Sequence, residues 1–372
     1  MEHTKKEGCS PMVDKNAVTL PEESDAEEEK RKYRKLAARR VLFLGVCLVL
    51  LFIVVGIALA IGSANMTFLD AYSAIFARAF PNWFHTEPLW DTVVWTLRMP
   101  RILLAVFAGA ILAMGGAMTQ DTLRNPLATP YTLGISAGAG LGAAIGIILG
   151  AGFLEGQLMV IGNAFVFSLV PIVVVLLARR RGASPEMMIL AGVAMAYLFN
   201  ACITILEYFA ESDALSRTMF WMIGDLTNAY WWQLPYVLGM LVITLVINVK
   251  FAWDVNIMKM GDDTAKSLGV EVDRSRKIVL VTACLSTATI VSFTGAIGFI
   301  CLLAPHICRA VIGGDERFLI VSSSIFGAIL LLIADIVARR LLAPIVLPVG
   351  AITAFLGGPL LLYLLVKKRT NH

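Results

Sequence analysis

The sequence predicts an all-α, polytopic membrane protein with about ten transmembrane helices. Of its 372 residues, 58% are hydrophobic and only 16% are charged, and the mean hydropathy is +0.78. A soluble domain is usually about a quarter charged and less than half apolar. The apolar residues also fall in runs long enough to cross a hydrocarbon core about 30 Å thick. These observations exclude a soluble globular fold.

Residues 1–40 form a polar tail of mixed charge before the first span. Its acidic run, residues 22–29, is unlike the acid-free start of a signal peptide, so we expect a disordered cytoplasmic segment, with a helical stretch leading into the first span as an alternative. The basic residues Lys35, Arg39 and Arg40 directly precede the first span. By the positive-inside rule they place the N-terminus in the cytoplasm.

The apolar runs that follow share a membrane-spanning length. They cover residues 41–61, 102–120, 131–151, 158–178, 187–207, 233–249, 278–294, 296–312, 318–336 and 348–366. The run from 278 to 312 is divided at Thr294–Gly295 because it is too long for one crossing. The predicted inner loops hold more Lys and Arg than the outer ones, which places both termini inside a cell membrane.

Two loops between the spans carry features of their own. The outer segment 207–232 mixes acidic and aromatic residues, and we expect a short helix there at the membrane interface. The inner segment 251–277 contains Asp262 and Asp263, which favour a helix start through the helix dipole. Gly269 lies where a C-terminal cap belongs. The inner segment therefore predicts a short surface helix.

A line of glycines marks the span at 131–151. Glycine occurs there at every fourth position, at Gly134, Gly138, Gly142, Gly146 and Gly150. This spacing places the five residues on one helix face, where a neighbouring helix can approach backbone to backbone. The span is therefore predicted to pack closely against another helix.

Polar residues mark both ends of the second span. A short hairpin with Asn125 follows it, and Arg98 and Arg101 flank Pro100 at its predicted outer end. A single arginine there would be expected to reach the membrane interface. Two arginines, with Arg339 and Arg340 also outside, make a docking patch for acidic side chains of a soluble partner an equal alternative.

Several kinds of chemistry find no support in the sequence. Ion-coupled carriers usually place ionisable residues near the bilayer centre, whereas the nearest case here, Asp335, lies at a predicted outer end beside Arg339, as a structural or docking pair. A Walker A loop is absent, so the chain does not hydrolyse ATP on its own. The six cysteines and four histidines lack metal-site spacing, and no nucleophile–base pair is present. We expect no catalytic residue, metal or cofactor on this chain, and no nucleic-acid partner.

A series of motifs gives the sequence a family resemblance. The motifs are LRMPR, GAILAMGGAMTQDTLRNPLATPYTLGISAGAGLGA, LAGVAM, GDDTAKSLGV, TGAIGFICLLAPHICR and ADIVARRLLAP…LPVGAITAFLGGPLLLYLL. In this order they resemble the FecCD-type permease subunits of ABC importers for iron–siderophores, haem and vitamin B12. The resemblance covers residues 41–368 as one permease domain with the type II importer fold. It implies import of a metal chelate by alternating access, an iron–siderophore first, with haem or cobalamin as alternatives. An ion-coupled secondary transporter without an ATPase is the first competing hypothesis, followed by an intramembrane enzyme and a non-transporting receptor or scaffold.

The resemblance also implies partners and residue roles. A second permease chain, two cytoplasmic subunits that bind ATP and Mg²⁺, and an extracytoplasmic substrate-binding protein would complete the transporter. Arg98, Arg101 and Arg339 would dock the binding protein, and Asn125 and Leu127 would form part of the cytoplasmic gate. The residues implied to couple to the ATPase are Gly261, Asp262, Asp263, Ala265, Leu268 and Gly269.

Overall fold

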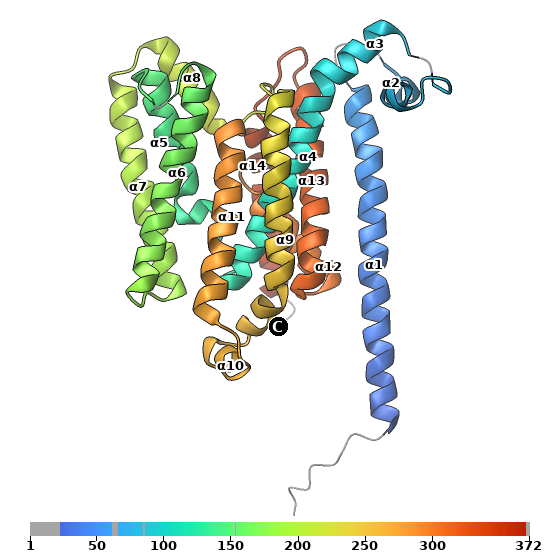
Figure 1. Ribbon diagram of the computed structural model, residues 1–372, viewed down its shortest axis with the longest axis vertical. Helices are drawn as coiled ribbons and strands as arrows, with labels where there is room; N and C mark the ends of the chain where they lie inside the picture. The colour runs from blue at the N-terminus through green and yellow to red at the C-terminus, as the bar shows by residue number, and fades with distance from the viewer. Residues whose placement is uncertain (1–22, 62–65, 85, 153, 370–372) are drawn as a thin grey trace, which may run out of the picture.

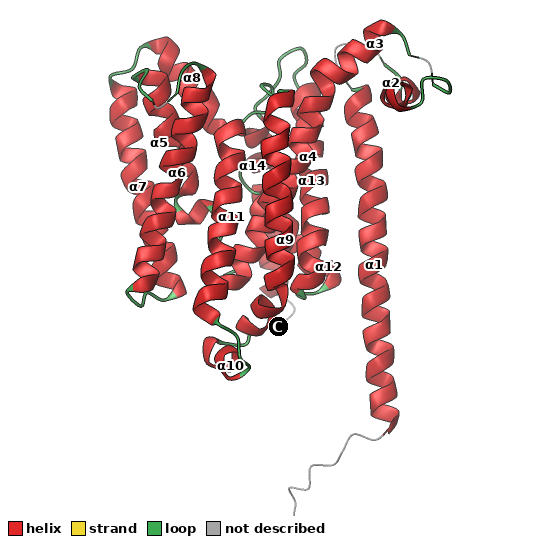
Figure 2. Cartoon of the chain, in the orientation of Figure 1, coloured by secondary structure: helices red, strands yellow, loops and turns green. Residues whose placement is uncertain are grey.

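Long apolar runs form helices because backbone groups in hydrocarbon must satisfy their hydrogen bonds within the segment. The computed structural model describes residues 23–61, 66–84, 86–152 and 154–369, and almost all of its regular structure is helical (Figures 1 and 2). The helices are α1 (Glu23–Ala60), α2 (Phe68–Ala79), α3 (Pro88–Thr92), α4 (Met99–Thr122), α5 (Ile135–Ile148), α6 (Gln157–Arg180), α7 (Pro185–Tyr208), α8 (Ser212–Ile223), α9 (Leu234–Met258), α10 (Asp262–Ser267), α11 (Val272–Thr294), α12 (Ile300–Ile312), α13 (Glu316–Arg340) and α14 (Val349–Arg369).

The predicted polytopic, all-α class is confirmed. Within the described residues, seven helices are long and apolar enough to cross a membrane: Arg34–Ala60, Pro88–Thr122, Gln157–Arg180, Pro185–Tyr208, Trp231–Met258, Val272–Thr294 and Glu316–Arg340. Three shorter apolar helices, namely α5, α12 and residues 349–363 of α14, account for the remaining predicted runs. The chain is therefore a multi-pass membrane protein.

Helix α4 lies at the centre of the bundle and packs against α9, α11, α12 and α13. Small residues allow these close approaches. A Cβ atom on Gly109 would lie 2.4 Å from the carbonyl oxygen of Gly327 in α13, and one on Gly116 would lie 1.8 Å from that of Cys301 in α12. Helices in a membrane associate through such close packing because hydrocarbon supplies no hydrophobic driving force between them.

Figure 1 shows the helices in two groups. Helices α5 to α8 lie together on one side, and α4, α9 and α11 to α14 form the larger group. Helix α1 stands at the outer edge of the larger group, and α10 projects from one end of the bundle. Helices α2 and α3 lie at the other end. Helix α11 packs against both groups, since it contacts α5 and α6 as well as α4 and α9.

The prediction that five glycines lie on one helix face is correct only for the three in the middle. Helix α5 holds Gly138, Gly142 and Gly146, which face α6; a Cβ atom on Gly142 would lie 2.3 Å from the carbonyl oxygen of Asn163. Gly134 precedes the helix with a left-handed φ of 90°, and Gly150 follows it with no atom near its Cβ position. The five glycines therefore do not share one helix, because left-handed residues end the helix on both sides.

Two predicted boundaries are wrong because helices continue past the apolar runs. Residues 23–40 form the start of α1, so the helical stretch leading into the first span, given as an alternative to disorder, is present; their many Glu, Lys, Arg and Ala residues favour helix. Residues 1–22 lie outside the described residues. Helix α9 extends to Met258 and α11 begins at Val272, so the expected loop 251–277 shrinks to residues 259–271 around α10.

The predicted break in the run 278–312 is confirmed. Helix α11 ends at Thr294, and α12 begins at Ile300 after Gly295 and Phe299, both of which have a positive φ. The short helix expected in segment 207–232 is α8. It packs against α5, whereas its placement at the membrane interface stays a prediction.

Candidate functional site

Helix α10 is a short helix with a well-formed end, as the sequence predicts. It follows Gly261, which has a φ of 121°, and begins at Asp262. At its end Gly269 adopts a left-handed φ of 84°. The N–H groups of Gly269 and Val270 donate to the carbonyls of Lys266 and Ala265, each at 3.0 Å. This pair of bonds is the Schellman motif, which stops a helix and satisfies its last carbonyls.

One side of α10 is anchored and the other is open. Ala265 is fully buried in a small cluster with Met258 of α9 and Val272 of α11. Leu268, at the end of the helix, is 61% exposed, and Asp263 is also exposed. Helix α10 therefore presents an exposed apolar side chain, Leu268, on a segment that Ala265 anchors to the bundle.

Asp262 ties α10 to two other parts of the chain. Its carboxylate accepts two hydrogen bonds from Arg276 of α11, at 2.8 and 3.0 Å, and it pairs with Arg124 at 3.0 Å. Arg276 is almost fully buried. The hydrogen bonds from Arg276 lower the pKa of Asp262 below its ordinary value, since they stabilise the charged form.

The hairpin after α4 begins with an unusual residue. Arg124 has a φ of 51°, in the left-handed region that glycine normally occupies at the end of a helix. Its N–H donates to the carbonyl of Asp121 at 3.3 Å, and the N–H of Asn125 donates to the carbonyl of Gln120 at 2.9 Å. These bonds form a second Schellman motif, so the direction in which the chain leaves α4 is fixed.

The two residues proposed for the gate lie together in this hairpin. The side-chain oxygen of Asn125 accepts a hydrogen bond from the N–H of Leu127 at 2.9 Å, and the carbonyl of Asn125 accepts one from the N–H of Ala128 at 3.0 Å. Leu127 is 48% exposed. The hairpin therefore presents an apolar side chain on a rigid turn. Its function as a gate stays a prediction.

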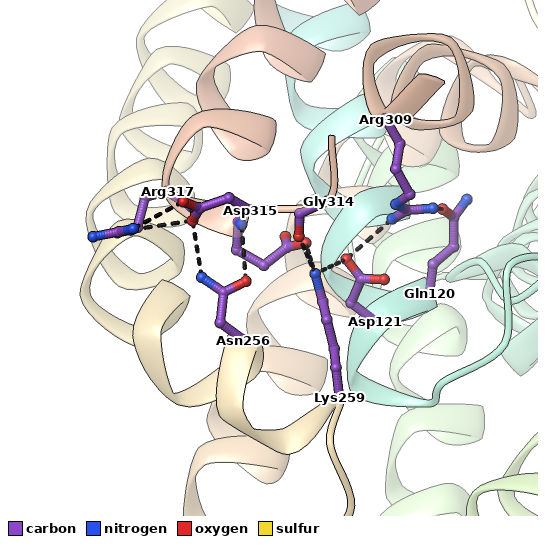
Figure 3. A network of polar contacts seen from close by, with 9 residues as sticks. Gln120, Asp121, Asn256, Lys259, Arg309, Gly314, Asp315 and Arg317 are labelled. Carbon is purple, nitrogen blue, oxygen red and sulfur yellow. Dashed lines mark hydrogen bonds and ion pairs between the residues drawn. The ribbon is translucent and has the colours of Figure 1, made fainter. Parts of the chain in front are cut away.

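A network of charged residues lies beside α10, where α4, α9 and α12 end and α13 begins (Figure 3). Lys259, directly after α9, pairs with Asp121 of α4 at 2.9 Å and with Glu316 of α13 at 2.6 Å, and it donates to the carbonyl of Gly314 at 2.6 Å. Arg309 of α12 also pairs with Asp121, at 3.0 Å. The network joins the ends of α4, α9, α12 and α13.

A second part of the network surrounds Asp315, at the start of α13 (Figure 3). Its carboxylate accepts hydrogen bonds from Arg317 at 2.8 and 3.1 Å and from Asn256 of α9 at 3.0 Å. Arg40 of α1 pairs with the same carboxylate at 3.2 Å. The hydrogen bonds from Arg317 and Asn256 lower the pKa of Asp315 to about 2.

Sequence reasoning missed this network. Apart from Lys259, which lies ten residues beyond its predicted run, each of its charges lies within a few residues of a predicted span end, where a lone charge is expected to reach water. The only available signal was that several predicted inner ends carry opposite charges. A single sequence does not indicate which of them meet.

The predicted docking arginines lie at the opposite end of the bundle, around the end of α1. Arg98 is only 7% exposed and donates to the carbonyls of Leu59 and Ala60. Arg339 donates to the carbonyls of Ala58 and Ile61, at 3.2 and 3.0 Å. Helix α1 has no basic residue in its last turn, so arginines from elsewhere meet its negative end.

Asp335 completes this cluster. It is fully buried in α13 and pairs with Arg101 at 2.8 Å and with Arg339 at 3.0 Å. The expected pairing of Asp335 with Arg339 is confirmed. The guanidinium groups of Arg98, Arg101 and Arg339 are thus engaged within the chain, a role that neither alternative for the arginine pair included. Docking of a partner stays a prediction.

Comparisons with known proteins decide the family. The model of the FecCD transport family matches residues 49–367. The chain belongs to the FecCD family. It is 42% identical to an ABC transporter permease of Methanocaldococcus jannaschii, over 91% of this chain and 97% of the relative. It is 36% identical to the hemin transport system permease HmuU of Yersinia pestis, over 89% of this chain and 97% of the relative.

A solved structure supports the same assignment. It is an inward-facing conformation of a metal-chelate type ABC transporter, with a TM-score of 0.77 and 27% identity over 87% of this chain and 98% of the other. The FecCD chain is therefore an ABC transporter permease, a kind of subunit without its own catalytic site. Such a permease implies ATPase and binding-protein partners. The family assignment argues against the ion-coupled alternative.

Proposed function

We propose that this chain is the transmembrane subunit of an ABC importer that moves a metal chelate into the cytoplasm by alternating access. The observation that carries the proposal is the construction of α10. Its two ends are fixed by Asp262 and the cap at Gly269, while Leu268 projects into solvent. Such a rigid apolar projection suits insertion into a cleft of a soluble ATPase subunit, which would drive the permease between two packings of similar energy.

The proposed orientation places the α10 end in the cytoplasm, with both termini on that side. Basic residues support it, because they gather at this end: the last turn of α6 has Arg179 and Arg180, the first turns of α11 have Arg274 and Arg276, and Lys266 lies on α10. An excess of Lys and Arg is typical of cytoplasmic loops.

The proposed assembly contains two permease chains, two ATPase subunits at α10 and a binding protein at the opposite end. ATP and Mg²⁺ would be bound by the ATPase subunits. For the binding protein we keep Arg98, Arg101 and Arg339 as the proposed contact region. Since their guanidinium groups already bind within the chain, the acidic groups of the partner would add to these contacts.

The proposed cargo is a ferric siderophore, with haem and cobalamin as alternatives. The permease has few fixed charges in the middle of its spans, which suits passage of a large chelate that must not be held tightly. HmuU, a relative, is a hemin transport permease by name. Uptake of radiolabelled iron as siderophore, of haem and of cobalamin by cells with and without the chain would separate the three.

The test of the proposal is a purification from the native membrane in mild detergent. We expect two permease chains with two copies of a P-loop ATPase, identified by mass spectrometry and particle mass. Repeated isolation of the permease without an ATPase, together with uptake that depends on an ion gradient, would overturn the proposal.

The role of Leu268 can be tested in the same complex. Leu268→Asp places a charge on the projecting residue, so we expect at least a tenfold loss of bound ATPase and of ATP-driven uptake. The matched control is Leu154→Asp, since Leu154 is also exposed but lies before α6, at the opposite end. An unchanged yield of ATPase with Leu268→Asp would remove α10 from the interface.

A further inference from the structure

Two ion pairs join the end of α4 to the segment that enters α10. They are Asp121–Lys259, at 2.9 Å, and Arg124–Asp262, at 3.0 Å. We propose that this ionic clasp is the link through which a movement of α10 is passed to the hairpin that holds Asn125 and Leu127. The inference rests on the proposed function, because it assumes that an ATPase subunit moves α10.

The clasp fixes one register between the two segments. In each segment the charged residues are three positions apart, and the order of the charges is reversed. Asp121, in the last turn of α4, precedes Arg124, just after it, whereas Lys259, just after α9, precedes Asp262, the first residue of α10. A shift of three residues would bring Arg124 to Lys259, or Asp121 to Asp262. Like charges would then meet, which is unfavourable at short range. The segments are therefore held to move together.

Arg124 occupies a position where its side chain is not required for the turn. Its φ of 51° is in the left-handed region, which is strained for any residue with a Cβ atom and which glycine adopts without strain. Its side chain is 37% exposed, and exposed ion pairs add little to stability. Local strain that stability does not explain is typical of functional positions.

The two ion pairs differ in how firmly they are held. Asp121 is also paired with Arg309, and Lys259 with the buried Glu316, so the first pair belongs to the fixed network of Figure 3. Arg124 stands outside that network and precedes Asn125 directly. The first pair thus serves as an anchor and the second as the moving contact. Arg124 is a positioning residue for the hairpin.

The variant Arg124→Gly separates this role from folding. Glycine suits the left-handed turn, so the variant should assemble with its ATPase and melt at the same or a higher temperature. The readout is the maleimide labelling of Leu127→Cys in the purified complex, with and without ATP and vanadate, corrected for labelling of the native cysteines. We expect the nucleotide-dependent change in labelling to fall at least fivefold in Arg124→Gly. Arg124→Lys, which keeps the charge, should restore most of it.

Two further variants sharpen the test. Arg274→Gln is the control, since Arg274 is an exposed arginine near α10 whose partner, Glu271, is also exposed; its labelling should match the wild type. In an Asp262→Asn background, Arg124→Gly should have no further effect, because the ion pair is already lost. An Arg124→Gly complex with the full nucleotide-dependent change would overturn the clasp alone. A wild-type chain that binds no ATPase would overturn the proposed function as well.

Discussion

Asp335 shows how a buried charge is kept in this permease. Its carboxylate is fully buried in α13 and is shared by Arg101 and Arg339. Removal of the last partner of a buried charge costs about 3–5 kcal/mol. Arg101→Gln leaves Arg339 in place, so we expect a smaller loss of unfolding free energy, of about 2 kcal/mol.

The measurement for Arg101→Gln is thermal unfolding of the purified chain in detergent. Arg340→Gln is the matched control, because Arg340 lies at the same end of α13 but is exposed. Equal melting temperatures for the two variants would show that Arg101 is not required to neutralise Asp335.

Asp315 gives a prediction for pH. Its pKa is about 2 in the folded protein, chiefly because of the hydrogen bond from Arg317, whereas an unperturbed aspartate titrates near 4. A lowered pKa stabilises the fold above about pH 4, and the contribution is lost as the pH falls through 2. Asp315→Asn should therefore melt below the wild type at pH 7, and the two melting curves should converge toward pH 2. A constant difference from pH 7 to pH 2 would contradict this assignment.

Residue pairs were predictable only when they were close in the sequence. Asp335 and Arg339 are four residues apart, which places them on one helix face, and the structure pairs them. Arg101, which binds the same carboxylate, is 234 residues away. Because the chain topology alone brings such residues together, neither this contact nor the network around Lys259 could be predicted from one sequence.

At the scale of helices, hydropathy predicted the apolar runs but not their ends. Helix α9 continues for nine residues beyond its apolar run, and the buried residues Ala252, Val255 and Met258 keep a helical spacing there.

Helix α5 is shorter than its predicted apolar run. With 14 residues, it extends about 21 Å, less than the hydrocarbon thickness. The start of this run, Tyr131–Leu133, is a 3-10 turn. Apolar residues have the same hydropathy in a 3-10 turn as in an α-helix, so the sequence did not indicate where α5 begins.

The contact between α5 and α6 can be tested at its glycines. A Cβ atom on Gly142 would lie 2.3 Å from a backbone oxygen of Asn163, whereas on Gly146 it would meet no atom closer than 3.4 Å. Overpacking of a core costs about 1–3 kcal/mol. We expect Gly142→Ala to lower the unfolding free energy by about that amount and Gly146→Ala to change it by less than about 1 kcal/mol. Similar thermal unfolding of the two variants would mean that α5 and α6 can separate without cost.

At the scale of the whole molecule, the two helix groups meet at a junction of backbones. The end of α8, the break between α11 and α12, and the start of α14 come together there. The N–H of Asp225 donates to the carbonyl of Thr294 at 2.8 Å, and that of Gly350 donates to the carbonyl of Gly224 at 3.1 Å. The backbones are in direct contact through these hydrogen bonds, so no flexible side chain lies between them that could move aside. A Cβ atom at the junction would collide with a backbone carbonyl, and the junction therefore requires glycine.

Gly350→Ala tests whether this junction holds the two groups together. Gly350 lies in the first turn of α14, and a Cβ atom on it would fall 1.7 Å from the carbonyl oxygen of Ile223. A backbone carbonyl cannot move aside as a flexible side chain can, so α14 and α8 would have to separate. We expect a loss of at least about 3 kcal/mol, at the upper end of overpacking costs.

The control for this prediction is Gly239→Ala in α9, where no atom lies within 4 Å of the added Cβ. Alanine favours helix over glycine by about 1 kcal/mol, so this variant should be as stable as the wild type or slightly more stable. The measurement is thermal unfolding together with size-exclusion profiles in detergent. If the Gly350→Ala and Gly239→Ala variants have the same melting temperature, the two helix groups are free to shift at the junction. The bundle is then held instead by the contacts of α11 with both groups.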